Sequence, residues 1–177
     1  MKKIAVVLAG GRGSRMNSDI PKQYLMLKDR PVLYYALKAF QDSDIDSIVL
    51  AAGENDLEMC RTQIVEKYGI NKVMAIVAGG AQRYDTVYNA LKAAQELTMD
   101  TASKEVLIYI HDGARPCISQ EIIKTAKKPH YDMVPVRQQS RLRIPLRWLV
   151  RKDLRLIRRT EIRCGRFRHR RYSAVIL

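Results

Sequence analysis

The chain has 177 residues, 47% hydrophobic and 28% charged, a balance typical of one ordinary globular domain. The three cysteines show no paired spacing, which argues against a zinc site and favours a reducing, cytoplasmic compartment. No stretch approaches the roughly 18 apolar residues of a membrane span, so no membrane partner is expected.

The first predicted element is a buried strand over residues 4–8, which leads directly into Gly10, Gly11 and Gly13. Glycine lets the backbone wrap closely around a ligand, and successive backbone N–H groups in such a turn form a concave anion site. Two cations, Arg15 and Lys22, follow the turn. This combination predicts a site for a nucleoside triphosphate.

Two well-known glycine patterns do not fit this loop. The dinucleotide fingerprint requires a third glycine where Met16 stands, and the P-loop requires Gly-Lys-Ser/Thr, whereas Gly13 is followed by Ser14 and Arg15. On these residues alone, a plain glycine turn after a strand is the competing interpretation.

The remaining elements alternate between helix and strand. We expect one helix that begins at Pro31, a second over residues 56–68 that ends at Gly69, a third over residues 87–97 and a fourth that follows a Ser119 cap. The strands are expected at 47–52, 72–78, 105–110 and 132–136. Such alternation predicts an α/β fold with a parallel sheet covered on both faces. Ligands of such sheets bind at the carboxyl ends of the strands.

Two further strand ends carry candidate functional residues. Gly79 and Gly80 close the third strand, and Thr86 follows with a hydroxyl that either binds a ligand or caps the next helix. The fourth strand ends in His111, Asp112 and Gly113.

A carboxylate such as Asp112 at a strand end can hold Mg²⁺, although Asp-Gly after a strand is also a common turn. Arg115 is placed to pair with a phosphate or to brace the loop. His111 is interpreted as a satisfied strand-end histidine rather than a base.

Together these stretches resemble a known family. Leu8-Ala-Gly-Gly-Arg-Gly-Ser-Arg15 with Pro21-Lys-Gln-Tyr24, then Gly79-Gly-Ala-Gln-Arg-Tyr-Asp-Thr86, then His111-Asp-Gly-Ala-Arg115-Pro stand in that family's order. They resemble the nucleotidyltransferases that activate sugar and polyol phosphates, in particular the cytidylyltransferases acting on 2-C-methyl-D-erythritol 4-phosphate. The resemblance covers residues 1–137; Gly10 stands where that subfamily usually has alanine.

The resemblance implies a Rossmann-like nucleotidyltransferase core with a mostly parallel sheet. It implies a reaction of CTP with a polyol phosphate that yields a CDP-alcohol and pyrophosphate for isoprenoid precursors, with Mg²⁺ as cofactor. The implied roles are catalysis for Arg15 and Lys22; nucleotide binding for Ala9, Gly10, Gly11, Gly13 and Arg115; base recognition for Gly80, Ala81 and Thr86; and metal binding for Asp112.

Residues 138–177 depart from this family. Residues 1–136 hold 18 Lys and Arg against 16 Asp and Glu, whereas residues 137–177 hold 14 against 2 and account for most of the net charge of +14. Gln138 follows Arg137 where the family has Asp-Thr and then an arm that pairs subunits. We therefore predict a truncated core followed by a solvated, non-native tail without strands, translated from a shifted reading frame. The family homodimer is not expected here, because its arm is missing.

Two alternatives remain at this stage. Ribitol 5-phosphate cytidylyltransferases share all three motifs, and the residues that would bind the alcohol lie beyond the resemblance. A nucleic-acid-binding module is the alternative from another class, with arginines on phosphates and Trp148, Phe167 and Tyr172 stacking on bases. We favour this alternative less, and expect no nucleic acid partner.

Overall fold

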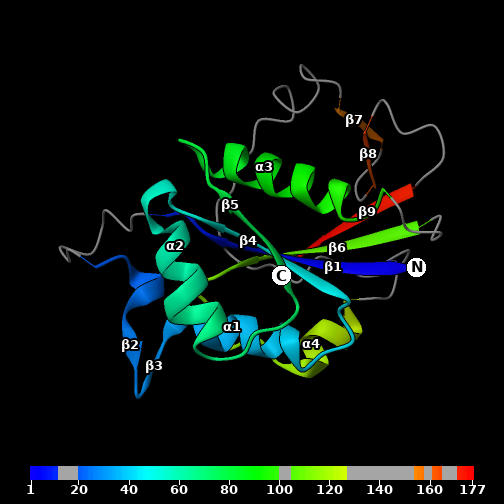
Figure 1. Cartoon of the computed structure of the whole chain (residues 1–177). Coiled ribbons are helices and arrows are strands. Elements are labelled where there is room, and N and C mark those ends of the chain that lie inside the picture. Colours follow the sequence, from blue (N-terminus) through cyan, green and yellow to red (C-terminus); the bar gives the residue numbers. More distant parts are fainter. Residues whose placement is uncertain (12–19, 100–104, 127–153, 158–160, 165–170) are drawn as a thin grey trace.

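The computed structural model describes residues 1–11, 20–99 and 105–126, the backbone of residues 154–157, 161–164 and 171–176, and Leu177 (Figure 1). The strands are β1 (Lys2–Ala9), β2 (Met26–Leu27), β3 (Arg30–Pro31), β4 (Ser47–Ala52), β5 (Val73–Ala78), β6 (Glu105–Asp112), β7 (Leu154–Ile157), β8 (Glu161–Cys164) and β9 (Arg171–Ile176). The helices are α1 (Val32–Gln41), α2 (Leu57–Met59), α3 (Arg83–Glu96) and α4 (Gln120–Thr125), with the short turns η1 (Lys22–Tyr24) and η2 (Glu54–Asp56) and the π-helical segment η3 (Cys60–Glu66).

Within the described residues, a seven-stranded sheet has the order β5-β4-β1-β6-β9-β8-β7. The pairs β5–β4, β4–β1, β1–β6 and β6–β9 are parallel, and β8 runs antiparallel to both β7 and β9. The predicted α/β class with a mostly parallel sheet is therefore confirmed. Short β2 and β3 form a separate hairpin.

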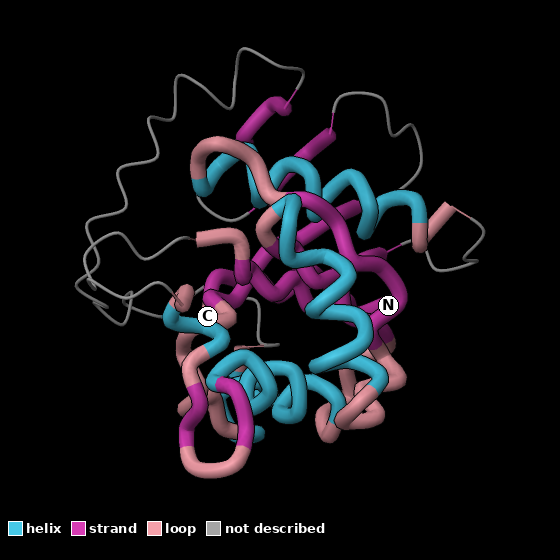
Figure 2. The backbone as a smooth tube through the Cα atoms, turned by 60° about the vertical axis from the view of Figure 1, so that its left-hand side comes forward, coloured by secondary structure: helices cyan, strands magenta, loops and turns pink. Residues whose placement is uncertain are grey.

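Both faces of the sheet are covered by helices. Figure 1 shows α3 on one side and α1, α2 and α4 on the other, and the turned view of Figure 2 shows the strands between them. Side chains of β1 alternate between the two cores: Ala5, Val7 and Ala9 pack with α1 and α4, and Ile4, Val6 and Leu8 pack with α3. A strand buried on both faces reads as a continuous apolar run, which explains the sequence of β1.

The helices follow the predicted apolar stripes. In α1, which begins after Pro31, the buried side chains include Leu33, Ala36, Leu37 and Phe40. The predicted helix over residues 56–68 is present as η2, α2 and η3 in succession, and Gly69 ends it with a φ of +63°. Glycine adopts this left-handed conformation without strain.

The expectation of a tail without strands was wrong for the backbone of β7, β8 and β9. Strand β9 pairs in parallel with β6 over six residue pairs, from Glu105 with Arg171 to Ile110 with Ile176. An open edge of β6 presents unpaired N–H and C=O groups, and the backbone of an extended segment can satisfy them even when few of its side chains are apolar. The predicted strand at 132–136, and Trp148 and Phe167, lie outside the described residues.

No helix in the described part of the chain is both long enough and apolar enough to cross a membrane.

Candidate functional site

The carboxyl ends of four neighbouring strands meet at one edge of the sheet. There the Gly113 N–H donates to the Leu8 carbonyl at 2.8 Å, and the Gly79 N–H donates to the Ala52 carbonyl at 2.7 Å. A Cβ added to Gly10 would lie 3.6 Å from the Cα of Gly79. The structure thus brings together the described parts of all three motifs that the sequence analysis singled out.

The first glycine loop is held from outside by Gln23. Its Nε2 donates to the Ala9 carbonyl at 2.6 Å and to the Gly11 carbonyl at 3.0 Å, and the residue is only 2% exposed. Sequence reasoning missed this role, although Gln23 belongs to the Pro-Lys-Gln-Tyr motif. The predicted loop residues Gly13 and Arg15 lie outside the described residues.

Lys22 is exposed at the start of η1. The same turn is fixed by Tyr24, whose hydroxyl lies 3.3 Å from Asp56 Oδ2 and 3.3 Å from Cys60 Sγ. Burial, and next the hydrogen bond with Cys60, raises the pKa of Tyr24, and burial also raises the pKa of the Cys60 thiol. Both groups therefore stay protonated near neutral pH and act as structural partners.

The second glycine loop is held by the helix that follows it. The Gly80 N–H donates to Thr86 Oγ1 at 3.0 Å, and Thr86 Oγ1 lies 3.2 Å from the Gln82 carbonyl, to which it donates. Gln82 and Asp85 form a capping box at the start of α3. Thr86 is 6% exposed, whereas Gly80 and Ala81 are exposed. Of the three predicted base-reading residues, two face outward and Thr86 supports the loop beneath them.

Gly80 is required by this packing. A Cβ at this position would lie 2.1 Å from the Cβ of Asp85, far inside any real contact. Gly11 is different, because a Cβ there would meet nothing within 4 Å. The packing at position 80 therefore admits only glycine, whereas there is open space beside the backbone at Gly11.

At the end of β6, Asp112 lies between two guanidinium groups. Arg83 Nη2 is 2.6 Å from Asp112 Oδ1, and Arg115 Nη2 is 3.0 Å from Asp112 Oδ2. Arg83 begins α3, so this pair ties the second motif to the third. Sequence reasoning missed Arg83; its presence inside a quoted motif was the available signal. For Arg115, the structure shows the bracing role that was one of the two predicted alternatives.

His111 braces the same turn. Its Nε2 lies 3.0 Å from the Arg115 carbonyl, and its ring meets Phe40 edge-on at a centroid distance of 5.6 Å. Burial lowers the pKa of His111, which keeps the imidazole neutral near pH 7. The Nε2 contact agrees with the interpretation of His111 as a strand-end histidine that braces the turn, but the histidine is only partly satisfied, because its buried Nδ1 has no hydrogen-bond partner within the described part of the chain.

Asp112 is the carboxylate at this edge that the sequence predicted as a metal ligand. Among the residues that the structure describes, no group of three or more His, Cys, Asp or Glu side chains is placed to hold a metal ion. Mg²⁺ in phosphate-transfer sites is usually held by one or two carboxylates together with substrate phosphates. A single strand-end carboxylate, which keeps further lone pairs beside its two arginine contacts, fits that mode of binding.

A parallel sheet with two glycine loops, a cation and a carboxylate at its carboxyl edge is typical of nucleotide-binding α/β proteins. The model of the family described as IspD, 2-C-methyl-D-erythritol 4-phosphate cytidylyltransferase, matches residues 3–134. The chain belongs to this family.

Individual relatives agree with this assignment. The 2-C-methyl-D-erythritol 4-phosphate cytidylyltransferase of Clostridium botulinum is 46% identical over 125 residues, which are 70% of this chain and 51% of the relative. That of Lachnoclostridium phytofermentans is 43% identical over 126 residues, 71% of this chain and 51% of the relative. The chain thus spans about half the length of the curated relatives it matches.

Solved structures resemble the same part of the chain. The 4-diphosphocytidyl-2C-methyl-D-erythritol synthase of Anaerococcus prevotii superposes with a TM-score of 0.53 at 29% identity, covering 71% of this chain and 48% of that one. The Francisella tularensis 2-C-methyl-D-erythritol 4-phosphate cytidylyltransferase gives 0.51 at 28% identity, covering 73% and 54%. A nucleotidyl transferase from Methanothermobacter, at 19% identity and a TM-score of 0.53 over 71% of this chain and 56% of that one, shares the fold.

Proposed function

We propose that this chain carries the CTP-binding part of a cytidylyltransferase that joins CTP to 2-C-methyl-D-erythritol 4-phosphate. The proposal rests on one observation. In a chain of this family, the three motifs that contain Gly10, Gly79 and Asp112 lie together at one edge of the sheet. The relatives that it matches bear the name of this activity. The products are the CDP-alcohol and pyrophosphate.

In this proposal the first loop binds the triphosphate. Backbone N–H groups of Ala9, Gly10, Gly11 and Gly13 surround the phosphates, and Arg15 and Lys22 neutralise their charge. Preorganised donors and cations of this kind stabilise charge that develops in the transition state. Support comes from the exposure of Lys22 beside the loop and from the open space next to Gly11.

The second loop reads the cytosine. Backbone groups of the exposed Gly80 and Ala81 contact the base edge, while Thr86 holds the loop and Arg115 contributes to nucleotide binding. A base read by rigid backbone groups is distinguished from other bases by its own donors and acceptors.

The chemistry needs no covalent enzyme intermediate. An oxygen of the substrate's phosphate forms a bond to the α-phosphorus of CTP, and the bond between that phosphorus and the α–β bridging oxygen breaks. Pyrophosphate leaves with the electron pair. The attacking phosphate is already anionic at neutral pH, so the residues supply position and charge rather than a base.

Mg²⁺ is the proposed cofactor, with Asp112 as its protein ligand. When bound, it supplies neutralisation of the phosphate charge. Asp112→Asn keeps the shape of the side chain but removes the charge, so the Mg²⁺ concentration needed for half-maximal CTP binding rises. An unchanged Mg²⁺ dependence would show that Asp112 is not a metal ligand. Arg83→Gln, which removes the positive charge, serves as the control for loss of the ion pair that Asp112 makes with α3.

The proposed function is tested by titrating the chain with CTP, UTP and ATP in the presence of Mg²⁺, followed by pyrophosphate release with 2-C-methyl-D-erythritol 4-phosphate or ribitol 5-phosphate. Preferential binding of CTP is expected. Equal affinity for the three nucleotides contradicts the proposal. Turnover with ribitol 5-phosphate alone would make that ester the substrate in place of 2-C-methyl-D-erythritol 4-phosphate. The pyrophosphate assay is run in parallel on a chain of the relatives' full length, because this chain matches only about half of them.

We also propose that residues 138–177 are a translated shifted frame. The family match stops at residue 134, close to the point where the charge balance changes. Translating the coding DNA in the other two frames from codon 138 is expected to produce Asp-Thr and further family sequence. If neither frame does so and β9 is protected from hydrogen exchange, the segment is a native part of the fold and the proposal is wrong.

A further inference from the structure

Gln23 is a buried polar residue in the middle of η1, between the exposed Lys22 and the half-buried Tyr24. A primary amide has two N–H donors on one nitrogen. Here that nitrogen lies 2.6 Å from the Ala9 carbonyl and 3.0 Å from the Gly11 carbonyl. The side chain therefore spans Gly10 and joins the glycine loop to the turn that carries Lys22.

This contact fixes the direction of backbone groups. In a trans peptide the C=O and the following N–H point in opposite directions. When Gln23 binds the Ala9 carbonyl, the N–H of Gly10, which lies in the same peptide plane, points away from Gln23. Since glycine has little conformational preference of its own, an outside contact is needed to hold one orientation.

The turn itself is anchored on its other side. The Tyr24 N–H donates to the Pro21 carbonyl at 2.8 Å, and the Tyr24 hydroxyl contacts Asp56 and Cys60. The Val32 N–H donates to the Leu25 carbonyl at 2.9 Å, which ties the end of the turn to the start of α1. Gln23 thus connects the glycine loop to a turn that is already fixed to the helical layer.

We propose that Gln23 is a positioning residue that holds the first glycine loop in register with Lys22, so that backbone amides and the ammonium group meet the same triphosphate. The inference rests on the proposed function for its ligand. Gln23, the buried residue of the Pro-Lys-Gln-Tyr motif, thus has a different role from Lys22. It acts through the loop and does not touch the nucleotide.

The test compares Gln23→Glu and Gln23→Met with a matched control, Gln120→Glu. Glutamate replaces the donor nitrogen with a carboxylate oxygen that faces the two carbonyls, and methionine removes the donors without adding charge. Gln120 also donates from Nε2 to a backbone carbonyl, that of Ala39 at 2.7 Å, but it begins α4, away from the loop. The same chemical change is therefore made at two places.

The first measurement is hydrogen exchange of the full chain without nucleotide. Both Gln23 variants are expected to raise exchange about tenfold in peptides covering residues 5–11 and 20–25, because local opening becomes easier when the two segments are uncoupled. Gln120→Glu is expected to affect only peptides of α1 and α4. Unchanged exchange at residues 5–11 in both Gln23 variants overturns the inference.

The second measurement is the affinity for CTP and for cytidine. Both Gln23 variants are expected to weaken CTP binding about 10- to 100-fold, while the affinity for cytidine changes less than about twofold, since the second loop is held independently. Equal weakening of both ligands indicates general damage to the fold and overturns the inference. Selective loss in Gln23→Glu but not in Gln23→Met indicates charge repulsion, and overturns it too.

Failure of the proposed function is seen separately. A wild-type chain that binds neither CTP nor cytidine contradicts the proposed function and the ligand part of this inference, whatever the exchange data show. The exchange measurement then decides alone whether Gln23 holds the loop.

Discussion

The two described glycine loops lie next to each other but are stabilised differently. The first loop is held by Gln23, a side chain 12 to 14 residues away on a separate turn. The second loop is held by Thr86, which lies six residues after Gly80 in the helix that follows the loop. A Cβ has room at Gly11 and none at Gly80. The loop proposed for the triphosphate is thus open and dependent on a distant contact, and the loop proposed for the base is packed by its own helix.

The largest expected effect tests the role of the first loop. Lys22→Ala is expected to reduce kcat about 100- to 1,000-fold, as does loss of one preorganised group that stabilises the transition state. Because Lys22 is exposed, the free energy of unfolding should hardly change. Steady-state pyrophosphate release, measured on a chain of the relatives' full length that carries the substitution, gives kcat, and denaturant unfolding measures stability.

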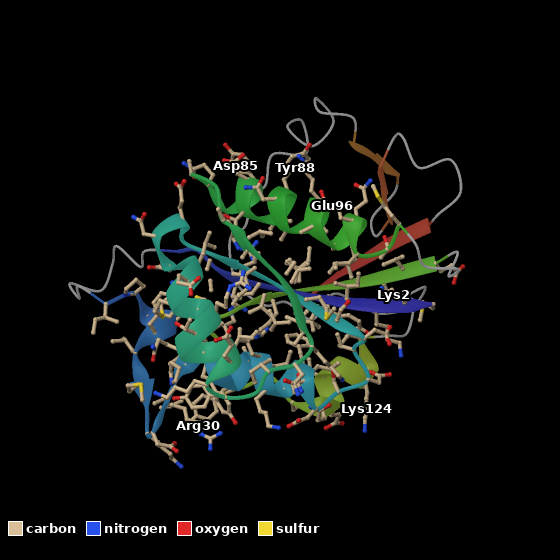
Figure 3. The ribbon with its side chains drawn as sticks, in the orientation of Figure 1. Lys2, Arg30, Asp85, Tyr88, Glu96 and Lys124 are labelled. Atoms are coloured by element: carbon tan, nitrogen blue, oxygen red, sulfur yellow. The ribbon has the colours of Figure 1, made fainter. Side chains whose placement is uncertain are left out.

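Lys124→Ala is the matched control for Lys22→Ala. Lys124 is an exposed lysine of α4, and Figure 3 shows it on the side of the molecule away from Asp85 and the start of α3. Normal turnover in Lys22→Ala, or an equal loss in Lys124→Ala, contradicts the assignment of the first loop.

The next effect compares the two loops directly with the same substitution. Gly80→Ala is expected to lower the free energy of unfolding by about 1–3 kcal/mol, because overpacking forces the backbone to shift. Gly11→Ala meets nothing within 4 Å and should stay within about 0.5 kcal/mol of wild type. Urea unfolding of both variants measures the difference. Similar losses in the two variants would show that the loops do not differ in packing.

A smaller effect concerns the hydroxyl that holds the second loop. Thr86→Val keeps the shape but removes the partner of the Gly80 N–H and the donor to the Gln82 carbonyl, with an expected cost of about 1 kcal/mol. Thr86→Ser retains the hydroxyl, and should retain most of the loop's protection from hydrogen exchange. If valine and serine at this position give the same exchange at residues 79–82, the hydroxyl does not hold the loop.

The difference between contacts within one short segment and contacts between distant segments explains what the sequence could predict. Thr86 as a cap, the stop at Gly69 and the Ser119 cap come from local patterns of a few residues. The last two are confirmed in the structure, whereas the first was wrong, because Gln82 caps α3 and Thr86 lies within the helix. The mostly parallel sheet followed from the alternation of helices and strands, because βαβ units pair their strands in parallel, whereas the order of the strands was not predicted. Contacts between distant segments, such as Gln23 with Ala9 or Arg83 with Asp112, leave no local pattern. Likewise, composition alone did not reveal β9, whose pairing depends on the open edge of β6.

The last expected effect is a pH dependence at the end of β6, beside both loops. His111 is buried and its pKa lies below the ordinary value of 6.5, so the folded state resists protonation more than the unfolded state does. The contribution of neutral His111 is present above pH 6.5 and is lost as the pH falls below it, because the unfolded chain then binds the extra proton. One such group changes the free energy of unfolding by at most about 1.4 kcal/mol per pH unit. Unfolding measured from pH 7.5 to 5 should show this decline in wild type and a flatter profile in His111→Gln, whose amide keeps a donor for the Arg115 carbonyl. Identical slopes in the two proteins would show that acid acts elsewhere, and that the turn linking Asp112 to Arg115 does not sense protonation of His111.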